Sequence, residues 1–200
     1  MSTTATTTPA GTTTTWAIDP AHTHVEFAVK HLMISTVRGR FAGVRGTVIT
    51  NDADPAKGIA EIDIDAASID TREAQRDAHL KSADFFHVEE HPKLIFKSKR
   101  VTDIKGDAFK LIGDLTIHGV TREVALDVTS GGRGKDPWGG ERAAFSAKTS
   151  VNREDFGLTW NQLLEAGGVL VGTKIDIDIE VQAIRAVQAD PARAGASAAA

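Results

Sequence analysis

Strict alternation of apolar and polar side chains is the pattern that most limits what this chain can fold into. Residues 174–182 read Lys-Ile-Asp-Ile-Asp-Ile-Glu-Val-Gln, with an apolar side chain at every odd position. Side chains on a strand point alternately to its two faces, so this segment is predicted to be a strand with one buried and one hydrated face. Seven more segments are predicted to be strands: residues 24–30, 37–50, 59–65, 93–101, 109–117, 122–130 and 142–151.

These strands are predicted to form one closed sheet. Closing the sheet hides its edges, and an antiparallel up-and-down barrel gives every strand two neighbours. The chain has 200 residues, of which 41% are hydrophobic and 25% charged, which suits one all-β domain. The folded unit is predicted at residues 16–187. A Thr-rich tail at 1–15 and an Ala-rich tail at 188–200 are both expected to be disordered.

One short helix is predicted within this β pattern, at residues 71–82. Asp70 can cap it, and Glu73 stands three residues later in the capping-box position. Most of its side chains are polar, and it runs into the aromatic pair Phe85-Phe86. Because it has little apolar surface to bury, we predict that it covers one end of the barrel and forms no part of the core.

A second segment without alternation, at residues 155–168, is predicted to be a loop with a short helical turn. Phe156, Leu158 and Trp160 give it one apolar side, so it is expected to be a second cover over a barrel end. For these three side chains, as for the phenylalanine pair above, two interpretations stay open. They either anchor a cover or contact a ligand.

Composition excludes several classes of protein. The chain has no cysteine, which removes disulfides, thiolate nucleophiles and cysteine-based metal centres and fits a reducing compartment. Its net charge of −4 indicates no basic patch for nucleic acid. Residues 1–15 do not read as a secretory signal, and no apolar run approaches the roughly 20 residues of a membrane span. The expected location is the cytoplasm, and the sequence leaves a homodimer open.

Five stretches, in order along the chain, carry a resemblance to a known family. They are Trp16-Ala-Ile-Asp-Pro-Ala-His-Thr-His-Val-Glu-Phe, Arg76-Asp-Ala-His-Leu-Lys-Ser-Ala-Asp-Phe-Phe, Gly113-Asp-Leu-Thr-Ile-His-Gly-Val-Thr, Arg153-Glu-Asp-Phe-Gly-Leu and Val171-Gly-Thr-Lys-Ile-Asp-Ile-Asp-Ile-Glu. In these residues the chain resembles the YceI-like family of polyisoprenoid-binding, lipocalin-like proteins. The resemblance implies an extended eight-stranded antiparallel lipocalin-like barrel that holds a long prenyl chain, with no catalytic residues. Family members are often exported, but a periplasmic location is not carried over.

The interior of an eight-stranded barrel holds its own side chains or one slim ligand. A prenyl ligand of about 40 heavy atoms, at about −0.3 kcal/mol per atom, would bind with about −12 kcal/mol, near nanomolar. The expected ligand is a polyprenyl (pyro)phosphate or quinone precursor, bound for transport, storage or sequestration, and no other cofactor is expected. The side chains predicted to line the apolar tunnel are Val25, Phe27, Val29, Phe41, Phe85, Phe86, Phe96, Leu115, Ile117, Phe145, Phe156 and Leu158.

The polar head of such a ligand needs cationic or hydrogen-bonding groups at one mouth of the barrel. Arg76, His79 and Arg153 are predicted to supply them, because both covers bring basic side chains near the rim. The planar guanidinium group of arginine also matches phosphate oxygens. In the structural alternative the two arginines pair instead with carboxylates that are close in sequence: Asp77, Asp84 or Asp155.

Seven histidines invite a metal-site interpretation, which the sequence does not favour. His22 and His24 share a predicted strand face, and His87 and His91 are four residues apart. Zinc catalysis needs three converging ligands, and a spacing of four converges only on a helix, which Pro92 opposes. No metal site is therefore predicted.

Two other functions stand as alternatives to lipid binding. A small enzyme, such as an isomerase or a metal-dependent hydrolase, would use the cavity as its active site, with His79, Asp84 or His118 as base. No sequence motif pairs these groups, so no catalytic residue is predicted. A protein-interaction module would use the hydrated acidic faces of the strands, which a solvated barrel exterior explains more simply.

Overall fold

The structure is a computed structural model that describes residues 12–165 and 167–186. Most of both predicted tails lies outside these residues. Thr13–Thr15, however, belong to the first strand, so the predicted start of the folded unit at residue 16 was too late. These threonines pair with Ile49–Asn51 across the sheet, a long-range contact that a Thr-rich composition does not show.

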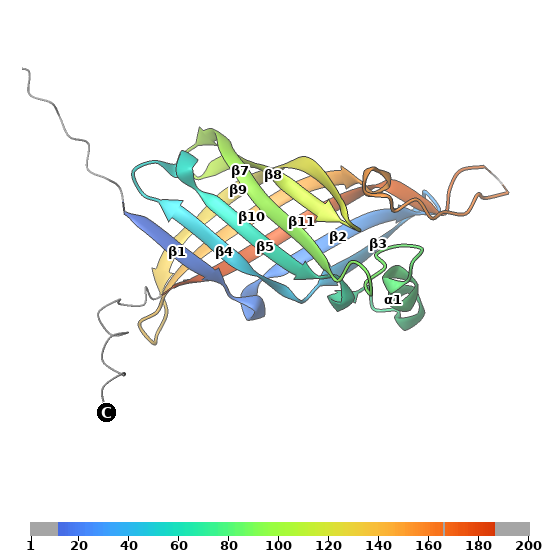
Figure 1. Cartoon of the computed structure of the whole chain (residues 1–200), viewed down its shortest axis with the longest axis horizontal. Coiled ribbons are helices and arrows are strands. Elements are labelled where there is room, and N and C mark those ends of the chain that lie inside the picture. Colours follow the sequence, from blue (N-terminus) through green and yellow to red (C-terminus); the bar gives the residue numbers. More distant parts are fainter. Residues whose placement is uncertain (1–11, 166, 187–200) are drawn as a thin grey trace, which may run out of the picture.

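Strands make up most of the described chain (Figure 1). The strands are β1 (Thr13–Ile18), β2 (His24–His31), β3 (Ser35–Phe41), β4 (Val44–Asn51), β5 (Ile59–Asp65), β6 (Ile69–Asp70), β7 (Lys93–Lys105), β8 (Ala108–Ile117), β9 (Val120–Lys135), β10 (Glu141–Asn152) and β11 (Val171–Arg185). The helices are α1 (Ala74–Lys81) and the short 3-10 helices η1 (Pro20–His22), η2 (Pro55–Lys57), η3 (Ala66–Ser68) and η4 (Arg153–Phe156). Within the described residues, no helix has the length and apolar character that crossing a membrane requires.

The sheet is antiparallel throughout and closes on itself. Its order is β1-β4-β5-β7-β8-β9-β10-β11-β2-β3-β6, and β1 also pairs with β11. Both β1 and β2 pair with β11. The next strands outward are β4, which pairs with β1, and β3, which pairs with β2. They are followed by β5, which pairs with β4, and β6, which pairs with β3. Counting each of these three interrupted pairs as one strand reduces the eleven strands to eight. The prediction of an eight-stranded antiparallel barrel is confirmed.

The three interruptions lie side by side in the barrel wall. They are η1, the pair Ala42-Gly43 and η3. The second and third are joined directly, because the Gly43 N–H donates to Ser68 Oγ (3.0 Å) and the Gly43 carbonyl accepts from the Asp65 N–H (2.8 Å). The short strand β6 follows and leads into α1, which therefore lies at one end of the elongated barrel (Figure 1).

The helix begins three residues later than predicted and has a different cap. Asp70 Oδ1 accepts the Arg72 N–H (2.9 Å) in a tight turn, and Arg72 adopts a φ of 63°. Because that backbone conformation is not helical, the first turn starts beyond it. Glu73 is the cap, and its carboxylate accepts the N–H groups of Gln75 and Arg76 (3.1 and 2.6 Å). No residue of α1 is buried, as expected for a cover.

The second cover begins at η4, earlier than predicted. Asn152 caps η4 by accepting the Glu154 N–H (3.0 Å), and Gly157, with a φ of 79°, ends it. Beyond it the chain doubles back, because Leu163 and Val169 form an isolated antiparallel bridge. This cover and α1 lie at the same end of the barrel (Figure 1).

Candidate ligand cavity

The inside of the barrel is hollow. Many inward apolar side chains are only partly buried although the barrel wall surrounds them, because they face unfilled space. They include Val48, Ile62, Ile64, Phe109, Leu111, Val124, Phe145, Ile175, Ile177, Ile179 and Val181. The cavity has a volume of about 520 Å³ and a mostly apolar wall. Ligand pockets in proteins are typically about 300–1,000 Å³.

All twelve side chains predicted to line an apolar tunnel do line this cavity. The odd-numbered residues between 174 and 182, which the alternation assigned to the buried face, line it as well: Ile175, Ile177, Ile179 and Val181. The alternation along each strand was sufficient to predict which side chains line the cavity, since every second side chain of a barrel strand points inward. Contact between these side chains and a ligand stays a prediction.

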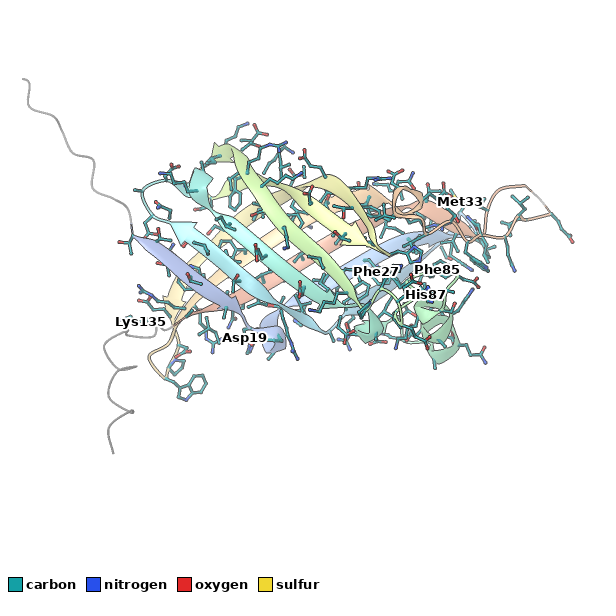
Figure 2. All side chains as sticks on the ribbon, viewed as in Figure 1. Asp19, Phe27, Met33, Phe85, His87 and Lys135 are labelled. Atoms are coloured by element: carbon teal, nitrogen blue, oxygen red, sulfur yellow. The ribbon has the colours of Figure 1, made fainter. Side chains whose placement is uncertain are left out.

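Aromatic side chains of the two covers close one end of the cavity. The ring of Phe85, which is 6% exposed, lies 5.3 Å from that of Trp160 between centroids. Phe86 packs edge-on against Phe41 at 5.7 Å, and Phe156, at the end of η4, is 1% exposed. Figure 2 shows Phe85 at the α1 end of the barrel. Phe85 and Phe86 thus anchor a cover and line the cavity at once, so the two interpretations of this pair are compatible.

The opposite end of the cavity opens to solvent. The lining side chains Ile59 and Ile104 are 46% and 43% exposed there, whereas Phe85, Phe156 and Leu158 at the α1 end are buried. The open mouth is formed by the loops that join β4 to β5 and β7 to β8, together with the end of β9. Lys135, the last residue of β9, is labelled at this end in Figure 2.

Arg133 is a cationic residue that lines the open mouth, and it was not among the predicted site residues. Its Nη2 donates to Asp52 Oδ1 (2.7 Å) and to Thr50 Oγ1 (2.9 Å), and the guanidinium group lies 5.1 Å from the centroid of the Trp16 ring. The hydrogen bond from Arg133 lowers the pKa of Asp52. In sequence, Arg133 is one basic residue in a Gly-rich stretch. Only the pairing of β9 in the barrel places it at the mouth.

Arg76 and His79 do not line the cavity, which corrects the head-group prediction for both. Arg76 donates from Nε to Thr71 Oγ1 and from Nη2 to the Thr71 carbonyl, both at 2.8 Å. His79 is hydrogen-bonded to Asp84 (2.8 Å), and its ring packs edge-on against Trp160 at 4.7 Å. The turn before α1 lets Arg76 reach back to Thr71, so both side chains secure the cover instead of facing the cavity.

Arg153 lines the cavity, but backbone carbonyls of the second cover and of β11 engage its guanidinium group. The residue is 3% exposed, and Nε donates to the Gly172 carbonyl (3.0 Å). The other nitrogens donate to the carbonyls of Leu158 and Val171. Its partners are therefore backbone carbonyls and not the carboxylate of Asp155 that the structural alternative proposed. Burial lowers the pKa of Arg153.

Three histidines come together beside the closed end. His87 and His91 lie in the loop between α1 and β7, and His118 lies in the turn between β8 and β9. The ring centroid of His91 is 6.1 Å from that of His87 and 4.7 Å from that of His118. Burial, followed by the charges of His91 and His87, lowers the pKa of His118. His87 and His91 lie outside a helix, as predicted, but they still converge with a third ring, because the β8–β9 hairpin supplies His118.

The groups considered for catalysis do not meet in the cavity. His79 and Asp84 bond to each other outside it, and neither they nor His118 belong to its wall. His22 lies in η1, so it does not share a strand face with His24 as predicted. The predicted bases therefore do not face the inside of the barrel.

Comparison with known proteins agrees with this architecture. The family model of the YceI-like domain matches residues 16–183. A UPF0312 protein of Staphylococcus aureus (strain N315) is 40% identical over 174 residues, or 84% of this chain and 96% of that protein. A crystal structure of a Campylobacter jejuni YCEI protein has a TM-score of 0.67 at 31% identity and covers 79% of this chain and 90% of its own. A structure described as a polyisoprenoid binding domain from Saccharophagus degradans shares the fold, with a TM-score of 0.59 at 14% identity, covering 86% of this chain and 98% of its own.

Proposed function

Since this chain belongs to the YceI-like family, we propose that it binds one long-chain isoprenoid lipid inside the barrel. The observation that carries the proposal is the apolar cavity, closed by aromatic side chains at the α1 end and open at the other. A slim hydrocarbon enters through the open mouth, tail first. Its far end packs against Phe85, Phe86 and Phe156.

Burial of the hydrocarbon supplies the affinity. The wall is preformed and apolar, so each Å² of prenyl surface removed from water contributes about 25 cal/mol. At about −0.3 kcal/mol per heavy atom, a chain of about 40 heavy atoms reaches nanomolar affinity. The head group therefore needs only to set the orientation of the ligand.

The head group of the ligand lies at the open mouth in this proposal, beside Arg133. A phosphate, pyrophosphate or quinone oxygen can accept a hydrogen bond from its guanidinium group. Asp52 already shares that group at 2.7 Å, so the head adds a modest part of the binding energy. This places the head at the end opposite to the one that the sequence predicted.

We infer the ligand class, an isoprenoid lipid, from the family and from the apolar cavity. The likeness to the Saccharophagus degradans domain, at 14% identity, shows the fold alone. Transport, storage or sequestration of the lipid is the corresponding role, and binding without catalysis is favoured because the predicted bases lie outside the cavity wall. The cytoplasmic location and the homodimer stay predictions.

Native mass spectrometry tests the proposed function directly. The protein is purified without detergent and measured before and after incubation with a polyprenyl phosphate of about 40 carbons, a length chosen from the energy per atom above. We expect either a retained lipid mass or uptake of one added lipid per chain. An apo mass that persists after incubation would rule out the lipid-carrier proposal.

Arg133→Gln tests where the head group lies. We expect it to weaken binding of a polyprenyl phosphate by about 3- to 10-fold, the loss of one charge-assisted hydrogen bond that is shared with a carboxylate. Binding of a polyprenyl alcohol of equal length should change much less, and the ratio of the two dissociation constants is the measurement. Arg40→Gln is the matched control, because Arg40 also pairs with an aspartate, Asp70, on the exterior. Equal losses for both ligands would place the head elsewhere.

A further inference from the structure

The cluster of His87, His91 and His118 has no part in the proposed lipid site. One ring nitrogen of each histidine can be chosen so that all three lie within 4.8 Å of one another. All three side chains are half-buried, and they come from two separate segments of the chain. The lone pairs of three neutral imidazole nitrogens that converge in this way can be shared by one cation.

We propose that these three histidines bind one divalent first-row transition metal ion, of which Zn²⁺ is the reference case. Imidazole nitrogen suits Zn²⁺, Co²⁺, Ni²⁺ and Cu²⁺, whereas Mg²⁺ and Ca²⁺ require oxygen ligands. Three protein ligands leave a fourth tetrahedral position for water or another small ligand. The proposal is independent of the lipid cavity.

Neighbouring groups orient two of the three rings for this role. Nδ1 of His87 lies 3.2 Å from Glu90 Oε2, which leaves Nε2 of His87 to face the ion. A Cβ placed on Gly157 would lie 3.4 Å from Nδ1 of His118, so this nitrogen faces the backbone that follows Phe156. Histidines that bind metals usually donate their other N–H to a carboxylate or a backbone carbonyl, which sets the ring orientation and raises the basicity of the ligand nitrogen.

The backbone around the cluster is shaped to bring the rings together. His87 and His118 adopt φ values of 46° and 51°, a left-handed conformation that residues other than glycine adopt infrequently. Gly119 follows with a φ of 73°, and a Cβ on it would lie 2.8 Å from Cε1 of His91. Any side chain at position 119 would therefore displace the central ring of the cluster.

The distances are compatible with a tetrahedral site after small movements. Zn–N bonds of about 2.0–2.1 Å place the nitrogens of a tetrahedral site about 3.4 Å apart. The upper limit of 4.8 Å then requires each ring to move inward by about 1 Å or less, which changes in side-chain torsion supply. The ion would join the loop after α1 to the β8–β9 turn, where His118 also lies against Gly157 of the second cover.

A Co²⁺ titration of untagged protein, followed by visible absorption, tests the proposal. A polyhistidine tag must be absent because it would bind the metal itself. We expect one equivalent of Co²⁺ to bind with the intense visible bands of a four-coordinate site, and Zn²⁺ to displace it. We also expect Zn²⁺ to raise the midpoint of thermal unfolding, since an ion that binds only the folded state stabilises it.

Variants test whether the metal binds at the cluster or at another histidine. His91→Ala is expected to lower Co²⁺ affinity by more than about 100-fold, and Glu90→Gln by about 10-fold, as for partners that orient metal ligands. His24→Ala, which removes an exposed histidine of β2, should bind like the wild type. Absence of saturable binding to the wild type would overturn the proposal even if His91→Ala failed to fold. Unchanged affinity in a folded His91→Ala would overturn it too.

Discussion

Replacing Ile177 by tryptophan is expected to weaken binding of a long prenyl lipid by at least about 100-fold while the barrel stays folded. Ile177 lies in the middle of β11 and lines the cavity beside Phe27. The larger side chain would fill the tunnel and keep the lipid tail from the closed end. Excluding about 20 of 40 heavy atoms, at about −0.3 kcal/mol each, removes about 6 kcal/mol, more than a 100-fold loss requires.

The cost to folding should be small, because Ile177 is only partly buried and the tryptophan enters space that is already empty. Lipid affinity and the free energy of unfolding are both measured, the first by titration and the second by urea denaturation. Glu180→Trp is the matched control, since Glu180 lies on the same strand with its side chain exposed. Wild-type affinity in Ile177→Trp would mean that the lipid binds outside the barrel.

Replacing Arg153 by methionine is expected to lower the free energy of unfolding by about 3–5 kcal/mol. The change removes a buried charge whose donors satisfy the carbonyls of Leu158, Val171 and Gly172. Methionine has a similar length but no donor, so the carbonyls of Leu158 and Gly172 would lose this partner at a buried site, whereas the Val171 carbonyl would keep the hydrogen bond from Asn161 Nδ2 (2.8 Å). Leaving one buried group unpaired costs about 1–3 kcal/mol, and hydrogen bonds from a charged group are among the stronger ones.

Urea denaturation of Arg153→Met beside Arg122→Met measures this effect. Arg122 is an exposed arginine of β9 whose Nη1 donates to the adjacent Thr121 carbonyl, so its replacement should cost less than about 0.5 kcal/mol. The loss of unfolding free energy in Arg153→Lys should fall between those of the two methionine variants, because a lysine ammonium group can reach some of the carbonyls that Arg153 contacts. A loss below about 1 kcal/mol in Arg153→Met would show that the second cover is held by apolar packing alone.

The strands and their inward faces could be predicted because both depend on a local property. A period of two in the side chains reports the two faces of a strand wherever the strand lies. The interruptions could not be predicted in this way. Residues 37–50 read as one strand but are divided at Ala42-Gly43, where Ser68 and Asp65 bond to the backbone from a distant segment. The interruption at Ala42-Gly43 comes to lie beside η1 and η3 only when the strands pair in the closed barrel.

The polar groups of this protein show the limit of sequence reasoning most clearly. Arg76 and Arg153 look equivalent in sequence, yet one bonds to Thr71 and the other to one carbonyl of the second cover and two of β11. No sequence pattern singled out Arg133 or joined His118 to the pair His87 and His91, because their partners come from other hairpins. The sequence by itself determined an all-β barrel, its family and the apolar lining of its cavity. Only the tertiary structure decided which end opens and which polar side chains meet, because strand register and barrel closure set those distances and no local pattern encodes them.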